Sequence, residues 1–223
     1  MNNNPIENVI EIKDLGILFQ YDLKFKKHID YICIKATRKF NYIKYVCRSF
    51  RNIHVLINLY NALIKSTLMF GSTIWNPTNK ALIKSLERIQ NKFLRFLSYR
   101  TNHPMRYIDH DYQNIMNISK LSTLEIARAK NDMKFVHKIA NTYLNTPDLK
   151  SNIMYYTPMN KPRSKTKIFL IDQKMIPFSI IHRICNLINL NKDWIFVKDL
   201  SIVQFQNLLQ TNTIKLNDSP YEI

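Results

Sequence analysis

The sequence is poor in the residues that several common functional sites require. Its 223 residues include only two glycines, Gly16 and Gly71, which are too few to form a glycine-rich loop that cradles phosphate. The three cysteines, Cys33, Cys47 and Cys185, are odd in number and share no Cys-x-x-Cys spacing. This pattern favours a reducing compartment, and it excludes both a disulfide framework and a zinc ribbon.

Catalytic combinations of side chains are also missing. None of the six histidines stands in a His-x-x-x-His pair, a Cys/His knuckle or a catalytic serine context. No two aspartates are adjacent, whereas two-metal nucleotidyl transfer needs acidic residues that converge on ions about 4 Å apart. The segment Asp109–Asp111 could clamp a cation, but isolated acidic loops are usually solvated. The residues therefore predict no catalytic group, no metal site and no cofactor.

Long apolar segments are lacking as well. No stretch approaches the run of about 18 uncharged apolar residues that a membrane-spanning helix needs, so we expect no membrane partner. The first residues, Met1–Pro5, have neither the basic region nor the apolar region of a secretion signal. We therefore expect an intracellular protein, in the cytoplasm or the nucleus.

What the sequence has in excess is positive charge. It contains 33 lysines and arginines against 16 acidic residues, a net charge of +17, which favours a polyanionic partner such as RNA or DNA. Hydrophobic residues make up 46% of the chain, which is enough for a packed core and excludes wholesale disorder. Ile, Asn and Lys are abundant, as is typical of an A/T-rich coding sequence, so mutational drift is an alternative source of some lysines. Where the cations lie therefore matters more than their number.

The hydrophobic pattern predicts a mainly α fold: a helical bundle, a short N-terminal β element and a small C-terminal helical segment. Val9–Lys13 alternates apolar and charged residues, and a turn at Gly16 separates it from the apolar residues 17–19, so one or two short strands are expected. Helices are expected within 24–51 and over about 53–70, 80–99, 122–144, 177–190 and 200–209, with a short strand over 168–171. The expected domains are a β element (1–20), the helical domain (21–145) and a C-terminal extension (146–223).

Local signals refine these helices. Thr78 or Asn79 is the expected N-cap of the helix over 80–99, and Ser122-x-x-Glu125 is typical of a capping box. The apolar side of the helix over 53–70 is expected to contain Leu56, Leu59, Tyr60, Leu63 and Thr67.

The helix over 80–99 has two opposite faces. At about 100° per residue, Leu86, Ile89 and Phe93 fall on one side. Five cations fall on the other side at spacings of 4, 4, 4 and 3 residues: Lys80, Lys84, Arg88, Lys92 and Arg95. These cations repel one another, and a phosphate backbone beside them would relieve that repulsion and release counterions. A solvated face in a lysine-rich protein is the alternative.

The first helix adds a second group of candidate nucleic-acid contacts. Lys35, Arg38 and Lys39 extend the set of expected phosphate ligands. Three tyrosines share the side of Lys35 and Arg38, opposite the apolar residues of the helix: Tyr31, Tyr42 and Tyr45. Such rings either stack on bases from an exposed face or lie buried against a neighbouring helix. The sequence leaves both interpretations open.

Five motifs along the chain have a familiar order. They are Lys13–Ile17 with Leu23-x-Phe25 and His28-Ile29, Leu59–Leu68 before Trp75-Asn76-Pro77, Leu86–Arg95, Leu124–Ile139, and Pro177–Asn186 with Ile195-Phe196 and Phe205. In this order they resemble the region just past the palm in reverse transcriptases of non-LTR (LINE-type) retrotransposons, above all the jockey-like and RTE-like enzymes. The resemblance implies a helical thumb and a C-terminal extension that grip the template RNA and the growing DNA.

The sequence departs from that family in two ways. The fingers and the palm, with the catalytic aspartates, would lie before residue 1, and Ala127-Arg128 stands where the family usually has two arginines. The expected function is therefore that of a reverse transcriptase fragment that binds nucleic acid nonspecifically and is no enzyme on its own. The alternatives are a non-catalytic subunit that docks in trans on a palm-bearing chain through Leu15, Ile17 and Phe19, and an inert relic.

Overall fold

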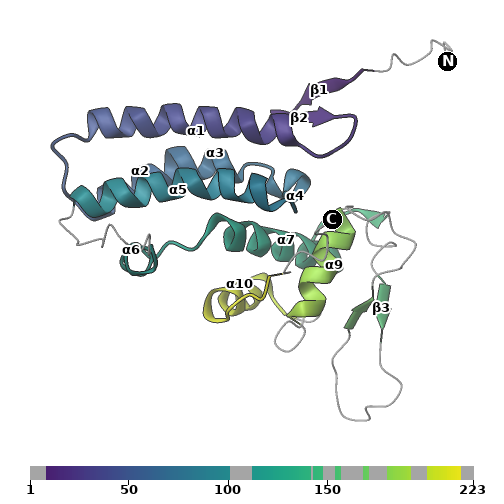
Figure 1. Cartoon of the computed structure of the whole chain (residues 1–223). Helices are drawn as coiled ribbons and strands as arrows, with labels where there is room; N and C mark the ends of the chain where they lie inside the picture. The colour runs from purple at the N-terminus through teal and green to yellow at the C-terminus, as the bar shows by residue number, and fades with distance from the viewer. Residues whose placement is uncertain are drawn as a thin grey trace. The chain divides into compact units, whose positions relative to one another are not determined.

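The computed structural model describes residues 9–100, 112–141, 143–147, 154–156, 168–170, 180–191 and 200–216. Within these ranges the protein is mainly helical, with two small antiparallel sheets, so the predicted fold class is confirmed (Figure 1). The first sheet pairs β1 (Glu11–Asp14) with β2 (Ile17–Gln20) around the turn at Gly16. The second sheet pairs β3 (Met154–Tyr156), which the sequence did not predict, with β4 (Ile168–Leu170).

The chain forms two compact units, residues 1–125 and 126–223. This division differs from the expected boundary at residue 145, because α7 (Leu124–Ala140) packs with α9 (Ile180–Leu190) and α10 (Ile202–Thr211). The core of the second unit consists of Ala129, Met133, Val136 and Ile139 from α7, Ile184, Leu187 and Ile188 from α9, Phe205 and Leu209 from α10, and Ile214. The predicted start of α9 at Pro177 lies outside the described residues.

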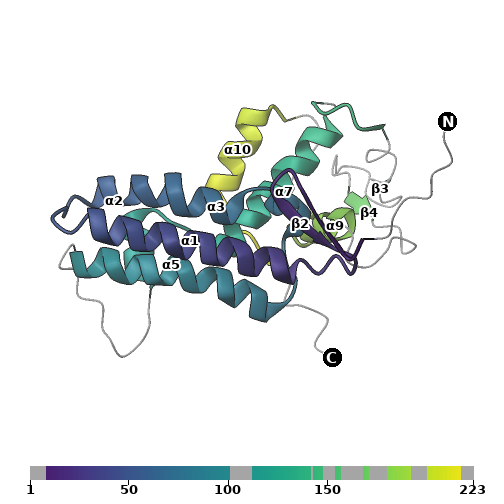
Figure 2. The ribbon, with the colours of Figure 1, turned by 90° about the horizontal axis from the view of Figure 1, so that it is seen from above.

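The first unit is a bundle built around α1 (Lys26–Val46) and α5 (Lys80–Arg100). Seen from above, α1 lies between α5 on one side and α2 with α3 on the other (Figure 2). α1 contributes Ile29, Ala36 and Ile43 to the shared core, and α5 contributes Leu86, Phe93 and Leu97. Because the buried side chains of each helix lie on one side, the opposite side of each is left for solvent.

The helix predicted over 53–70 contains a wider turn that the sequence analysis missed. It runs as α2 (Ile53–Leu59), the π-helical segment η1 (Tyr60–Lys65) and α3 (Ser66–Met69). Its fully buried residues are Leu56, Tyr60, Ile64 and Leu68, whereas the predicted Leu59, Leu63 and Thr67 are only partly buried. In an α-helix, side chains four residues apart are offset by about 40° around the helix axis, so a row with this spacing gradually leaves the core side. The wider π turn offsets this rotation. The four side chains therefore stay in one row facing the core.

The break after α3 depends on Gly71. Its φ is 61°, and a Cβ at this position would lie 2.7 Å from Ile17 Cδ1. The short helix α4 (Ser72–Trp75) follows, and the Trp75 indole donates to the Phe70 carbonyl at 2.7 Å. Gly71 thus allows close packing between the hairpin and the end of α3.

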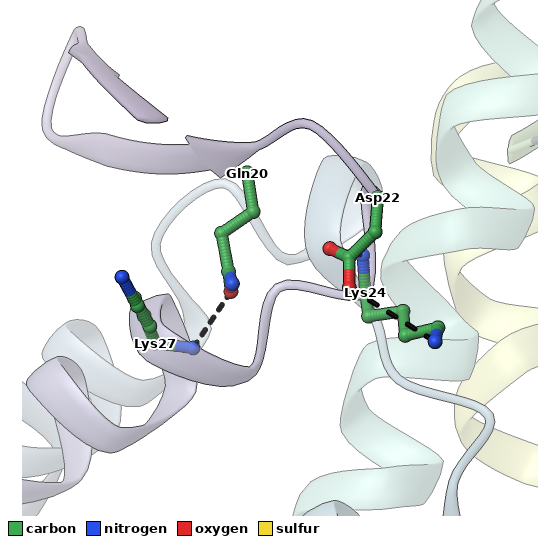
Figure 3. Close-up of polar contacts among 4 residues, drawn as sticks. All are labelled: Gln20, Asp22, Lys24 and Lys27. Atoms are coloured by element: carbon green, nitrogen blue, oxygen red, sulfur yellow. Dashed lines mark hydrogen bonds and ion pairs between the residues drawn. The ribbon is translucent and has the colours of Figure 1, made fainter. Parts of the chain in front are cut away.

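The hairpin also positions the start of α1 (Figure 3). Gln20 Oε1 accepts a hydrogen bond from the Lys27 backbone N–H at 2.9 Å, and Asp22 Oδ1 accepts one from the Lys24 N–H at 3.1 Å. The Lys27 ammonium lies 2.7 Å from Glu11 Oε2, and that of Lys24 lies 4.0 Å from Asp22 Oδ2. These two lysines therefore have carboxylate partners inside the unit.

Among the helices that the structure describes, none combines the length and the apolar character needed to cross a bilayer.

Candidate nucleic-acid interface

The cations predicted on one face of α5 all lie on its surface. Asn79 begins the helix, because its side chain accepts the Ala81 N–H at 2.8 Å and its carbonyl accepts the Ile83 N–H, so the expected cap is confirmed. The packed side of the helix includes Leu86, Ile89, Phe93, Phe96 and Leu97. The exposed side carries Lys80, Lys84, Arg88, Lys92 and Arg95. The structure thus brings these five residues together along one surface of the helix.

This surface carries one sign of charge. Within the described ranges, Lys84, Arg88, Lys92 and Arg95 form no ion pair. Arg95 has a ring beside it, since its guanidinium carbon lies 6.0 Å from the Tyr112 centroid. Within those ranges the four cations lack a carboxylate partner and are available to an external anion. Binding to a phosphate backbone would release the counterions of that backbone, which favours such contacts.

The one acid of α5, Glu87, has a structural role. Its Oε1 accepts a hydrogen bond from the backbone N–H of Glu125 at 2.8 Å. In the predicted capping box the Ser122 side chain would accept from this N–H. The structure shows a carboxylate from another helix as its acceptor. One helical turn away, Gln90 Nε2 donates to the Ser122 carbonyl at 3.0 Å. The Glu87 and Gln90 side chains therefore join α5 to the start of α7.

The predicted cations of α1 divide into two groups. Lys35 and Arg38 are exposed. Lys39 is partly buried, and its ammonium donates to Thr67 Oγ1 at 2.7 Å. Because Thr67 lies on α3, this contact holds Lys39 on the packed side of α1, away from the other two. The structure therefore places Lys35 and Arg38 together and Lys39 apart from them.

The tyrosines of α1 are exposed rather than packed against a neighbouring helix. The relative exposures are 38% for Tyr31, 63% for Tyr42 and 73% for Tyr45, so the interpretation that these rings lie buried against a neighbouring helix is wrong. The Lys13 ammonium lies 5.1 Å from the Tyr31 ring centroid, within cation–π distance. α1 thus presents aromatic rings and cations on the same side.

Sequence reasoning missed one residue of the α5 face. Tyr99 is 74% exposed and follows Arg95 by four residues, so it continues the row of cations by one helical turn. The four-residue spacing was the signal that could have identified it. The next residue, Arg100, turns back over the Phe96 ring at 5.4 Å from the centroid.

The described part of the second unit is held by buried polar groups. Asp132 is buried, and the Arg183 side chain donates to both of its carboxylate oxygens, at 3.1 and 3.4 Å. His137 is buried between Phe205 and Tyr143, and its Nε2 lies 3.0 Å from the Leu200 carbonyl. Burial lowers the pKa of His137, and the Leu200 hydrogen bond opposes that effect. Asp132 and the Nε2 atom of His137 thus have partners within the unit.

Two further expectations concern a metal site and the two arginines that LINE-type reverse transcriptases usually have where this chain has Ala127-Arg128. Ala127 and Arg128, which stand at the position of that pair, are both buried, so neither belongs to an exposed face. In the part of the chain that the structure describes, no group of three His, Cys, Asp or Glu residues could hold a metal ion. The segment Asp109–Asp111 lies outside those residues.

Comparison with known proteins finds a relative that covers part of the chain. An uncharacterized protein of Caenorhabditis elegans is 27% identical over 139 residues, which are 62% of this chain and 68% of that protein. No protein-family model matches the chain, and no solved structure matches it. The relative's name assigns no activity, so the function has to be inferred from the residues described above.

Proposed function

We propose that this chain is a nucleic-acid-binding fragment of a LINE-type reverse transcriptase, corresponding to the thumb and C-terminal extension that follow the palm. In this proposal it binds RNA or DNA without sequence preference and does not polymerise DNA by itself. The five ordered motifs and the mainly helical fold support the assignment. The lack of sequence preference follows from phosphate contacts, which position a protein on nucleic acid but do not read bases.

The observation that carries the proposal is the α5 face. Its cations are exposed at helical spacing, four of them form no ion pair within the described residues, and the acid of the helix is bonded to the Glu125 amide. Such a row is mildly unfavourable for the isolated helix, because like charges at i and i+4 repel. A phosphate backbone converts that repulsion into binding.

The proposal is tested by replacing Lys84, Arg88, Lys92 and Arg95 together with alanine. All four side chains are exposed, so the substitutions leave the core intact, and alanine favours the helix. If counterion release were the only term, removing four phosphate-binding cations would lower the affinity by roughly three log units at 0.1 M salt. Fluorescence anisotropy with labelled RNA and DNA measures this decrease.

A matched control removes the same charge elsewhere. Lys24, Lys26, Lys27 and Lys120 are exposed, lie off the α5 face and include the two lysines with carboxylate partners. Their alanine variant should retain most of the binding. Equal decreases in the two variants would show that only total charge matters, which is the expectation for an inert relic whose cations arose by drift.

The exposed hairpin favours a second candidate, a subunit that docks in trans on a palm-bearing reverse transcriptase chain. Ile10, Ile12 and Leu15 are 73%, 56% and 85% exposed. Ile17 is buried in this unit and Phe19 is partly buried, so of the residues expected to dock only Leu15 keeps its side chain exposed. Primer extension by a palm-bearing chain, with and without this protein, tests the candidate. An Ile12→Lys variant should abolish any stimulation.

A further inference from the structure

We infer that the exposed side of α1 is a stacking surface for the unpaired bases of single-stranded nucleic acid. The inference deepens the proposed function, on which it rests, by naming the form of nucleic acid that the protein prefers. The surface comprises Tyr31, Lys35, Arg38, Tyr42 and Tyr45, and we call it the tyrosine face.

The rings of the tyrosine face are more exposed than tyrosine rings of a packed bundle would be. The α1 residues that contact α5 and α3 include Phe40, which meets Phe96 with ring centroids 6.0 Å apart, and Lys39, which bonds to Thr67. Tyr42 and Tyr45 project away from those contacts and keep 63% and 73% of their surface exposed. Exposing the apolar surface of such a ring to water is unfavourable in free energy, and a base stacked on the ring covers that surface.

The two cations of the tyrosine face lie between its first ring and its last two rings. The order along α1 is Tyr, Lys, Arg, Tyr, Tyr at spacings of 4, 3, 4 and 3 residues, which keeps all five on one side of the helix. The fourteen residue steps from Tyr31 to Tyr45 span about 21 Å of helix, which is long enough for several nucleotides of one strand. α1 contains six lysines and arginines and a single acid, Asp30. Its charge therefore complements a polyanion.

Rings and cations make different contributions to binding. Cations contact phosphate in single strands and duplexes alike, whereas tyrosine rings can stack only on bases whose faces are not covered by their own neighbours. A face with both groups therefore binds single strands more tightly than duplexes. The α5 face has one ring near its end, Tyr99, and is otherwise built of cations, so it should bind both forms.

The test compares a thymidine oligonucleotide with a DNA duplex of equal length. In the full chain, Tyr42→Ala combined with Tyr45→Ala should weaken single-strand binding by about fivefold or more for each ring that stacks. Duplex affinity should stay the same. The slope of log K against log salt should also stay the same, because the charge of the chain is unchanged. Lys35→Ala combined with Arg38→Ala should instead reduce that slope for both ligands.

Two controls keep the result interpretable. Tyr42→Phe combined with Tyr45→Phe keeps the rings and should bind like the natural chain. Tyr21→Ala removes a ring that is 81% exposed but lies outside the tyrosine face, and it should have no effect.

The outcomes separate the inference from the proposed function. If the chain binds both ligands and the alanine pair leaves single-strand affinity unchanged, stacking is refuted while the proposed function stands. The exposed rings would then point to a protein partner. If the natural chain binds neither ligand, both proposals fail.

Discussion

Replacing Tyr60 with phenylalanine should destabilise the first unit by breaking an interior chain of hydrogen bonds. The Tyr60 hydroxyl donates to Gln90 Oε1 at 2.6 Å, and Gln90 Nε2 donates to the Ser122 carbonyl. Burial, with a smaller effect of the Glu87 charge, raises the pKa of Tyr60, so the hydroxyl remains a neutral donor. Phenylalanine keeps the stacking on Phe93, whose ring centroid lies 4.3 Å away, so the substitution isolates the hydrogen bond.

The size of the effect follows from burial. Tyr60 and Gln90 are at most 1% exposed, so water cannot replace the missing donor, and Tyr60→Phe should cost about 1–3 kcal/mol. Gln90→Leu should cost more, because it removes a partner from both the Tyr60 hydroxyl and the Ser122 carbonyl. Once Gln90 is leucine, Tyr60→Phe removes a hydroxyl that already lacks this partner and should be nearly neutral. The two changes should therefore be coupled by at least about 1 kcal/mol.

Urea unfolding of the natural chain, the two single variants and the double variant measures that coupling. The sequence contains two tryptophans, so a Trp194→Phe background leaves Trp75 as the reporter, and Trp75 is buried in the first unit. A double variant whose destabilisation equals the sum of the single effects, with a coupling below about 0.5 kcal/mol, would refute the hydrogen-bond chain.

The remaining predictions concern His28 and Gly71. Burial lowers the pKa of His28 from its ordinary 6.5, so the contribution of the neutral imidazole to the stability of the first unit should be complete above pH 6.5 and decrease as the pH falls below that value. His28→Gln should flatten this dependence of the urea midpoint, and a variant with an unchanged pH profile would contradict it. Gly71→Ala should cost more than about 1 kcal/mol, because it adds strain at positive φ to a contact 2.7 Å from Ile17. Gly16→Ala, where the nearest atom would be 3.6 Å away, should cost less in the same assay, and equal costs would contradict the role of the close contact.

Features that depend on a repeating pattern within one helix could be predicted from the sequence. The exposed row of cations on α5 and the Asn79 cap follow from residues a few positions apart, and the structure shows both. Leu56 and Tyr60 were predicted on the apolar side of the helix over 53–70, but Ile64 and Leu68, which continue the same four-residue repeat through η1 and α3, were missed. In a regular α-helix, side chains at this spacing would rotate gradually around the axis. Their repeat therefore indicates a π turn only once it is known that all four face the core.

Features that depend on contacts between segments could not be predicted. The Glu87 carboxylate caps Glu125 from 38 residues away, and no local pattern marks such a partner. Lys39 shares a helix with Lys35 and Arg38, yet its bond to Thr67 depends on where α3 lies. The exposure of Tyr42 and Tyr45 likewise depends on which side of α1 its neighbours cover. Helical spacing places residues on a face, and only packing decides whether that face is covered.

The salt dependence of nucleic-acid binding tests the central claim most directly. The slope of log K against log salt should be smaller in the Lys84, Arg88, Lys92 and Arg95 alanine variant than in the natural chain. The expected decrease for each phosphate-binding cation removed is about 0.7 on a single strand and about 0.9 on a duplex. A variant with the slope and affinity of the natural chain would contradict the claim that the exposed face of α5 holds phosphate.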